Sequence, residues 1–202
     1  MIAALVLAAG GSSRMGRPKQ TLLLDGVPML QRVLNTLRES NVGRVVVVLG
    51  GSAVEVRRHV RFDDELVVVN PSYSKGMSSS LRLGLKHVGT DADAVIIALG
   101  DQPFVHPATI DTLVSTYEGS RAPIVIPTHK GARGNPVLFD RRVFPQIAGI
   151  RGDIGAKHVV EENAADVLEV EVPDRGVLVD IDTPADLKRV MKVRRRRNRE
   201  QA

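Results

Sequence analysis

The chain has 202 residues, of which 43% are apolar and 3% aromatic, with no cysteine and a net charge of +5 at pH 7. This length fits one domain with an aliphatic core, and the lack of cysteine excludes disulfides, thiolate metal sites and a thiol nucleophile. Few aromatic side chains argue against nucleic-acid binding by base stacking, and no apolar run resembles a signal peptide or a membrane span, so we expect a cytoplasmic protein.

The strongest signal lies in the first expected strand and the loop after it. The apolar run Ile2–Leu7 predicts a buried parallel strand. It continues into AAGGSSRMGRPKQ, residues 8–20, where glycines permit a tight turn and close approach of the backbone to a ligand. Arg14 and Lys19 add positive charge that does not change with pH near neutrality. Free backbone N–H groups and two cations at a strand end predict a polyanion site, most simply for a nucleotide triphosphate.

Two other phosphate loops and an ordinary turn are the alternatives. Gly11 and Gly16 have the Walker A spacing, but Arg17-Pro18 follows where that motif needs lysine and a hydroxyl. The residues after Gly10 do not supply the dinucleotide pattern G-x-G-x-x-G. A Gly/Ser-rich turn would explain the glycines alone, but not their ordered combination with two cations.

Along the rest of the chain, apolar runs alternate with helical patterns. Further strands are expected at Arg44–Leu49, Leu66–Val69, Ala94–Leu99, Ile124–Pro127, Pro136–Phe139, Val167–Val172 and Gly176–Asp180. Helices are expected at Pro28–Ser40, from a capping box at Ser52–Glu55, at Met77–His87, Pro107–Tyr117, Asp140–Ile147 and Asp153–Asn163, and from Thr183. This alternation predicts an α/β protein with a three-layer, Rossmann-like nucleotide-binding fold and a mostly parallel sheet.

The loops after successive strands are expected to meet at one sheet edge, where ligands bind in open α/β folds. Gly50-Gly51, Asn70 with Gly76–Ser80, and Asp101 all follow expected strands. A carboxylate such as Asp101 at the end of an apolar strand is desolvated unless it has a cationic partner. Its functional interpretation is a Mg²⁺ ligand, because Mg²⁺ combines one or two carboxylates with waters and phosphate oxygens. The alternative is a cap for the helix that begins near Pro107.

The loop at residues 8–20 resembles the signature of the nucleotidyltransferases that activate molybdopterin, the MobA-like NTP transferases of the sugar-nucleotide and cytidylyl transferase superfamily. Further similar segments are Asn70-Pro71 with Gly76–Ser80, Leu99–Pro103, Gly134–Phe139, Gly152–Lys157 and Val179–Pro184. Their order and spacing are most similar to those of molybdenum cofactor cytidylyltransferases. The resemblance reaches to about Met191, so we expect one nucleotidyltransferase domain over residues 1–191.

The resemblance implies a Mg²⁺-dependent enzyme that transfers CMP from CTP to molybdopterin, releases pyrophosphate and serves a molybdoenzyme client. Alternatives of the same chemistry are guanylyl transfer from GTP, or cytidylyl transfer to methylerythritol phosphate or a sugar phosphate. An alternative from another class is a nucleotide-binding accessory protein without turnover. The joint presence of Arg14, Lys19, Asp101 and Asp182 favours an enzyme, because a binder needs no paired magnesium carboxylates.

The resemblance also implies roles for site residues. The catalytic residues would be Arg14, Lys19 and Asp101, with Lys19 at the α-phosphate in the transition state. Asp101 and Asp182 would bind the metal, although Asp182 also suits the start of the helix after Thr183. Nucleotide-binding residues are expected to be Ala8, Ala9, Gly10, Gly11, Gly50, Asn70, Gly76, Ser79 and Ser80. The serines would alternatively cap a helix. Family members with A-A-G at the positions of Ala8–Gly10 tend to use CTP, which favours CTP over GTP.

The acceptor is expected to contact Arg133, Asn135, Asp153 and Lys157. Arg133 and Lys157 suit the phosphate of a pterin side chain, but solvated surface charges would explain them equally well. Many family members carry histidine at the position of Asn135, so the resemblance does not define the acceptor.

The net charge of +5 resides in residues 192–202, which leaves the body of the chain neutral. We interpret this basic segment as a solvated, disordered tail. The alternative is an electrostatic arm for an acidic partner or nucleic acid. Nothing else in the chain favours nucleic-acid recognition, so a nucleic-acid partner is not expected.

Overall fold

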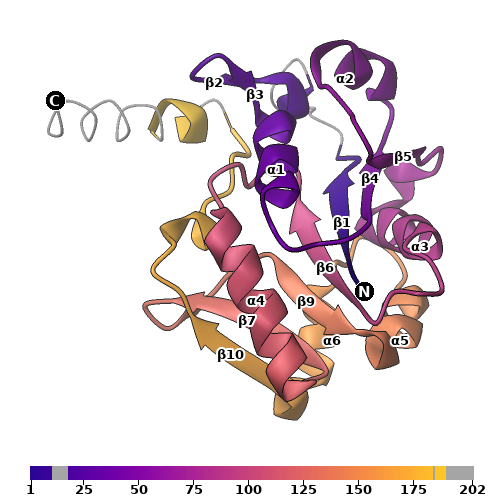
Figure 1. The fold of residues 1–202 in the computed structure, drawn as a ribbon. Coiled ribbons are helices and arrows are strands. Elements are labelled where there is room, and N and C mark those ends of the chain that lie inside the picture. The colour runs from indigo at the N-terminus through magenta and orange to yellow at the C-terminus, as the bar shows by residue number, and fades with distance from the viewer. Residues whose placement is uncertain (11–17, 184, 190–202) are drawn as a thin grey trace, which may run out of the picture.

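The structure is a computed structural model that describes residues 1–10, 18–183 and 185–189 (Figure 1). Its strands are β1 (Ile2–Ala8), β2 (Leu23–Leu24), β3 (Val27–Pro28), β4 (Val45–Leu49), β5 (Leu66–Val69), β6 (Ala94–Leu99), β7 (Ile124–His129), β8 (Ala132–Arg133), β9 (Val137–Asp140) and β10 (Val167–Glu171). Its α-helices are α1 (Met29–Arg38), α2 (Ala53–His59), α3 (Met77–His87), α4 (Pro107–Ser120), α5 (Phe144–Gly149) and α6 (Lys157–Glu162). Residues 185–189 are also helical. Within the described ranges, no helix combines the length and apolar character needed to span a bilayer.

The main sheet has the order β10-β7-β9-β6-β1-β4-β5, with β8 paired to β7. β1 lies in the interior of the sheet and pairs in parallel with β4 and β6, and β4 pairs in parallel with β5. β9 is antiparallel to both of its neighbours, and β2 and β3 form a separate hairpin. The predicted α/β fold with a mostly parallel sheet is therefore confirmed.

Two apolar clusters, one on each face of the sheet, give the fold its three layers. Alternate residues of β1 divide between them, with Ala4 and Val6 in one cluster and Ala3 and Leu5 in the other. The first cluster includes apolar residues of α1, α2 and α4, and the second includes residues of α3, α5 and α6. Figure 1 shows α1 and α4 in front of the sheet. Because both faces are covered, the central strands are continuous aliphatic runs.

The expected strand at Gly176–Asp180 is wrong. Arg175–Leu178 forms the 3₁₀-helix η5, in which the Asp174 carboxylate accepts a hydrogen bond from the Gly176 N–H at 2.8 Å. The apolar run is buried by this turn rather than by pairing in the sheet.

Two helix starts also differ from the sequence expectations. α2 begins after Ser52, but the Ser52 side chain makes no capping hydrogen bond, because its backbone (φ −92°, ψ 15°) lies outside the extended region that N-caps usually adopt. The helix expected over Asp153–Asn163 begins only at Lys157. In contrast, the hydroxyl of Thr183 and the carboxylate of Asp186 form the expected cap of the last helix, with an Oγ1–Oδ2 distance of 2.7 Å.

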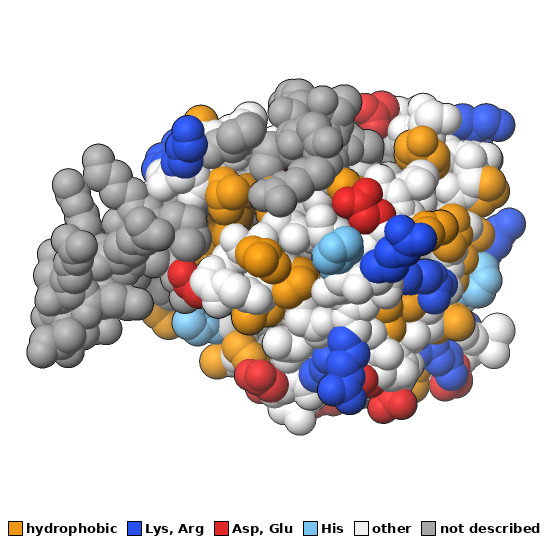
Figure 2. All heavy atoms as spheres, turned by 90° about the horizontal axis from the view of Figure 1, so that it is seen from above, with side chains coloured by type: hydrophobic (Ala, Val, Ile, Leu, Met, Phe, Trp, Pro, Cys, Tyr) orange, Lys and Arg blue, Asp and Glu red, His pale blue; other side chains and the backbone are white. Residues whose placement is uncertain are grey.

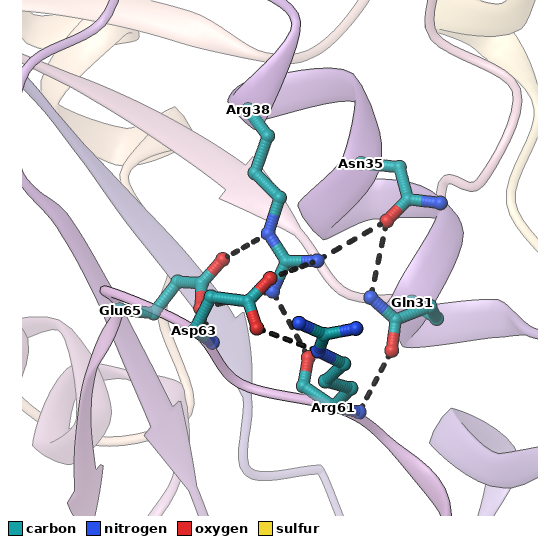
Figure 3. A network of polar contacts seen from close by, with 6 residues as sticks. All are labelled: Gln31, Asn35, Arg38, Arg61, Asp63 and Glu65. Carbon is teal, nitrogen blue, oxygen red and sulfur yellow. Dashed lines mark hydrogen bonds and ion pairs between the residues drawn. The ribbon is translucent and has the colours of Figure 1, made fainter.

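A polar network fixes the end of α1 to the loop that leads into the edge strand β5. Figure 3 shows its six residues, Gln31, Asn35, Arg38, Arg61, Asp63 and Glu65. The Arg38 guanidinium donates to both oxygens of Glu65 at 2.7 and 3.1 Å, and also to the Arg61 carbonyl at 3.0 Å. Asp63 pairs with both arginines. The Glu65 carboxylate is only 3% exposed, so this fork-like pair is shielded from water on one side.

Glu65→Gln is expected to lower the free energy of unfolding by about 1.5–3 kcal/mol at pH 7, because one oxygen of the charged pair becomes an amide donor. Burial alone would raise the pKa of Glu65, but Arg38 and backbone N–H groups outweigh it and lower this pKa below 4.5. The pair therefore contributes stability above that value and loses it as pH falls through the folded-state pKa. Urea unfolding of both proteins between pH 3 and 7 should show the difference shrinking in acid, with the exposed Glu39→Gln as a silent control.

Candidate active site

The candidate site lies where β1, β4 and β6 end together. The register pairs Ala8 with Leu49 and Leu7 with Leu99, so residues after these three strands emerge at one edge. Figure 2 looks down on this edge and shows acidic, basic and apolar side chains on the described part of that face. Ligands bind at such carboxyl edges in open α/β sheets.

Gly50 lets the ends of β1 and β4 approach each other closely. A side chain on Gly50 would overlap the carbonyl oxygen of Ala9 and would stand 3.1 Å from the ring of Tyr73. A Cβ on Gly51 would lie 2.5 Å from the Tyr73 hydroxyl oxygen. Ala9, the Gly50-Gly51 turn and the Tyr73 ring are therefore packed closely together at this edge of the sheet.

Gly50→Ala is expected to destabilise the fold by about 1–3 kcal/mol, because its methyl group meets backbone rather than a side chain that could move. The added methyl group would also displace the backbone of Ala9, and this displacement should weaken nucleotide binding. Chemical unfolding and calorimetric titration with a nucleoside triphosphate would measure the two effects. Gly119→Ala in α4 is the matched control, since an added Cβ there meets nothing within 4 Å. Equal behaviour of the two variants would contradict this role for Gly50.

Hydrogen bonds join three of the predicted nucleotide-binding residues. Asn70 is 3% exposed, and its amide donates to the hydroxyls of Ser79 at 2.8 Å and Ser80 at 3.0 Å. Its carbonyl oxygen accepts from the N–H of Ser72 at 2.9 Å. The network holds the loop from Asn70 to Gly76 against α3. Gly76, with φ 96°, is the N-cap, so the serines lie inside the first turn rather than capping it.

Asp153 caps α3 from a distant part of the chain. Its carboxylate accepts a hydrogen bond from the Met77 N–H at 3.1 Å. The backbone of Gly152 and Asp153 lies against Gly76, so a Cβ at Gly76 would come within 2.6 Å of the Gly152 carbonyl oxygen. Asp153 therefore has a direct structural contact with the start of α3, where a negative charge is favourable.

The structure does not bring the four expected acceptor residues into mutual contact. Arg133 on β8 pairs with Glu169 on β10 at 2.7 Å, and Lys157 on α6 is 87% exposed and pairs with Glu161 at 3.6 Å. The N–H of Asn135 donates to the Val177 carbonyl at 3.0 Å.

At the end of β6, a lysine stands between two carboxylates. The Lys19 ammonium, at the start of the 3₁₀-helix η1 (Lys19–Thr21), donates to Asp101 Oδ2 at 2.5 Å and to Asp182 Oδ1 at 3.0 Å. The Ile181 N–H donates to the Asp101 carbonyl at 3.1 Å and so connects the two acidic turns. Burial lowers the pKa of Lys19, but the two carboxylates outweigh this effect and raise it. Lys19 is therefore a permanent cation at this edge at neutral pH.

Three further polar residues of this centre had no role assigned from the sequence. Gln102 is 3% exposed and donates to Asp180 Oδ1 at 2.6 Å. Burial, together with the nearby charges of Asp101 and Asp182, raises the pKa of Asp180. The buried amide of Gln20 donates to the Ala8 carbonyl at 2.8 Å and so ties η1 to the end of β1. The sequence does contain a signal for the two glutamines, because each directly follows a predicted site residue: Gln20 follows Lys19, and Gln102 follows Asp101.

The carboxylates fit a hard divalent cation. Asp101 Oδ1 is buried and has no hydrogen-bond partner among the described residues. Asp182 is half-exposed and adds a second carboxylate within reach of the same ammonium. In the described part of the chain, no cluster of three or more His, Asp or Glu side chains is arranged to hold a metal by itself. A cation here would need further oxygens from a ligand, as Mg²⁺ at phosphate sites does. Arg14 and Gly11, also expected at this site, lie outside the described residues.

A doubly covered, mostly parallel sheet with a cation and paired carboxylates at its carboxyl edge is typical of enzymes that bind nucleotides and transfer phosphorus groups. Residues 4–167 match the MobA-like NTP transferase domain, so the chain belongs to this family and is a nucleotidyltransferase. The resemblance to the MobA-like NTP transferases is confirmed.

Similar proteins cover almost the whole chain. The crystal structure of Rv0371c from Mycobacterium tuberculosis is 34% identical with a TM-score of 0.87, covering 95% of this chain and 97% of that one. A structure of Rv0371c in complex with manganese is 32% identical with a TM-score of 0.83, covering 95% and 98%. The purine catabolism protein PucB of Bacillus subtilis is 30% identical over 89% of this chain and 91% of its own. Nicotine blue oxidoreductase of Paenarthrobacter nicotinovorans is 27% identical over 94% and 96%.

Proposed function

We propose that this nucleotidyltransferase transfers CMP from CTP to the phosphate of molybdopterin, with Mg²⁺ as the metal and pyrophosphate as the second product. The observation that carries the reaction type is the contact of Lys19 with both Asp101 and Asp182 at the end of β6. The choice of CTP rests on the A-A-G sequence of Ala8–Gly10, and the choice of acceptor rests on the resemblance of the motifs.

The reaction is an in-line substitution at the α-phosphorus. An oxygen of the acceptor phosphate forms a bond to the α-phosphorus, while the bond to the oxygen that bridges the α- and β-phosphates breaks and its electron pair leaves with pyrophosphate. The acceptor phosphate is already ionised at neutral pH, so no nucleophilic side chain and no general base is required. The protein must bring two repelling anions together and stabilise negative charge in the transition state.

In this proposal, Lys19 contacts the α-phosphate and stabilises the charge that develops on its oxygens. Arg14 binds the β- and γ-phosphates with its planar fork of donors. Asp101 and Asp182 would hold Mg²⁺, which when bound neutralises phosphate charge. Gln20 keeps η1, and with it Lys19, next to β1 through the hydrogen bond to Ala8.

The base would lie along the backbone of Ala8–Gly10, next to the Gly50-Gly51 turn. Small residues there leave peptide N–H and C=O groups open to the edge of the base. Gly11 would add a backbone donor to the phosphates. Asn70, Ser79 and Ser80 act through the loop that they hold against α3, and Gly76 permits the close approach of Asp153.

The acceptor would approach from the side of Arg133, Asn135, Asp153 and Lys157. Asp153 then acts by positioning α3, since its carboxylate accepts from Met77 and would repel a phosphate. The product would pass to a molybdoenzyme client, and we place the reaction in the cytoplasm.

The test is turnover with molybdenum-loaded molybdopterin and Mg²⁺, with CTP, GTP or ATP offered separately. Pyrophosphate release and the dinucleotide product, identified by mass spectrometry, should both appear preferentially with CTP. Preference for GTP would support the guanylyl alternative. Because one relative is named an oxidoreductase, NADH and NADPH oxidation is followed in parallel. Oxidation without pyrophosphate release would contradict the proposal.

A further inference from the structure

The ammonium of Lys19 occupies the place between two carboxylates that a metal ion would need. It lies 2.5 Å from Asp101 Oδ2 and 3.0 Å from Asp182 Oδ1, two residues that come from turns far apart in the chain. The Lys19 and Asp101 side chains are 16% and 20% exposed, so water screens their attraction only in part. The lysine joins the two turns as a bridging cation would.

A divalent ion in contact with both carboxylates would compete with this ammonium. Mg²⁺ lies about 2.0–2.1 Å from its oxygen ligands, which leaves no room for an ammonium hydrogen-bonded to the same two oxygens. Even bound through Asp101 Oδ1, which has no hydrogen-bond partner among the described residues, the ion would meet a positive charge at close range. Lys19 would therefore have to move away as the metal enters.

We propose that Lys19 is the internal counter-ion of the metal-free enzyme, holding Asp101 and Asp182 together until a divalent ion replaces it and releases its ammonium toward the nucleotide phosphates. This inference rests on the proposed metal-binding role of the two carboxylates. Without Lys19, Asp101 would be a largely buried carboxylate next to Asp182, and the two like charges would separate the turns. With Lys19 in place, the metal binds weakly alone and more strongly once phosphates offer the ammonium a new partner.

The first test measures Mn²⁺ binding to the full chain without nucleotide, from the electron paramagnetic resonance signal of free Mn²⁺. Lys19→Met should bind Mn²⁺ about tenfold more tightly than the wild type, because one close positive charge is removed. Lys19→Arg keeps the charge and should bind as weakly as the wild type. Lys86→Met, at the exposed C-terminal end of α3, is the matched control. Unchanged or weaker binding by Lys19→Met would overturn the inference.

A second measurement uses the wild type and so does not depend on folding of a variant. Acetylation of Lys19 by acetic anhydride, followed by mass spectrometry, should be slow without metal and several-fold faster with Mn²⁺, relative to the exposed Lys130 in the same sample. A rate that Mn²⁺ leaves unchanged or lowers would contradict the inference.

The outcomes separate this inference from the proposed function. Tighter Mn²⁺ binding by Lys19→Met without cytidylyl transfer by the wild type would support the counter-ion and reject the reaction. Wild-type transfer with no gain in Mn²⁺ affinity would support the reaction and reject the counter-ion.

Discussion

Lys19→Met is expected to lower the rate of nucleotidyl transfer by about 100- to 1,000-fold, the usual cost of removing one charged group from a developing oxyanion. Most of the affinity for CTP should remain, because backbone groups and Arg14 would also contact the nucleotide in the proposed site. In the proposed reaction, the ammonium turns from Asp101 and Asp182 to the α-phosphate, whose oxygens gain negative charge as the bonds change. The interaction is thus made mainly in the transition state, and its loss lowers kcat more than it raises KM.

Steady-state rates with CTP, together with calorimetric binding of CTP, would separate these two effects. Lys86→Met serves again as the control, because this lysine lies in the last turn of α3. Normal turnover by Lys19→Met would exclude the role assigned to Lys19. If kcat/KM fell only as much as the affinity for CTP, with kcat unchanged, Lys19 would contribute to ground-state binding only.

Asp101→Asn is expected to reduce metal-dependent turnover by about 1,000-fold or more, since a bound metal ion stabilises the transition state by several kcal/mol. One oxygen of Asp101 is buried and has no hydrogen-bond partner in the part of the chain that the structure describes, and the other accepts a hydrogen bond from the Lys19 ammonium. An amide would keep the shape of the side chain but lose the charge that attracts a divalent ion. The amide would also hold the Lys19 ammonium less firmly in place. The variant would therefore lose both metal binding and the correct position of Lys19.

The rate should be measured over a range of Mg²⁺ and Mn²⁺ concentrations, because a weakened site would need more metal while a lost site would not respond. Asp166→Asn, on the exposed turn before β10, is the control for the loss of one negative charge. Full activity of Asp101→Asn at ordinary Mg²⁺ concentrations would mean that the metal binds elsewhere.

The central strands could be predicted because both of their faces are buried. β1, β4 and β6 are uninterrupted aliphatic runs, and glycine or alanine-glycine follows each of them. The segment Gly176–Asp180 has similar composition but could not be assigned correctly. In its 3₁₀ conformation, Gly176 donates a hydrogen bond to Asp174 and packs against the backbone carbonyl of Phe104. A local pattern of apolar residues does not indicate either contact.

The sequence indicated which residues belong to the site better than it indicated the contacts that they make. Lys19, Asp101 and Asp182 follow from motifs, and the structure brings them together across 82 and 163 residues. That one lysine would bridge both carboxylates depends on the sheet order, which local patterns do not contain. For the same reason, the cap that Asp153 provides to α3 could not be foreseen. Its expected contact with the acceptor stays a prediction.

The central claim is transfer of the α-phosphoryl group together with its nucleoside, and isotopic labelling tests it directly. CTP labelled at the α- or the γ-phosphorus is incubated with Mg²⁺ and molybdenum-loaded molybdopterin. We expect the α-label to move to the acceptor and an equal amount of γ-label to appear as pyrophosphate. Transfer of the γ-label to the acceptor, or its release as inorganic phosphate with the α-label left on CDP, would contradict it.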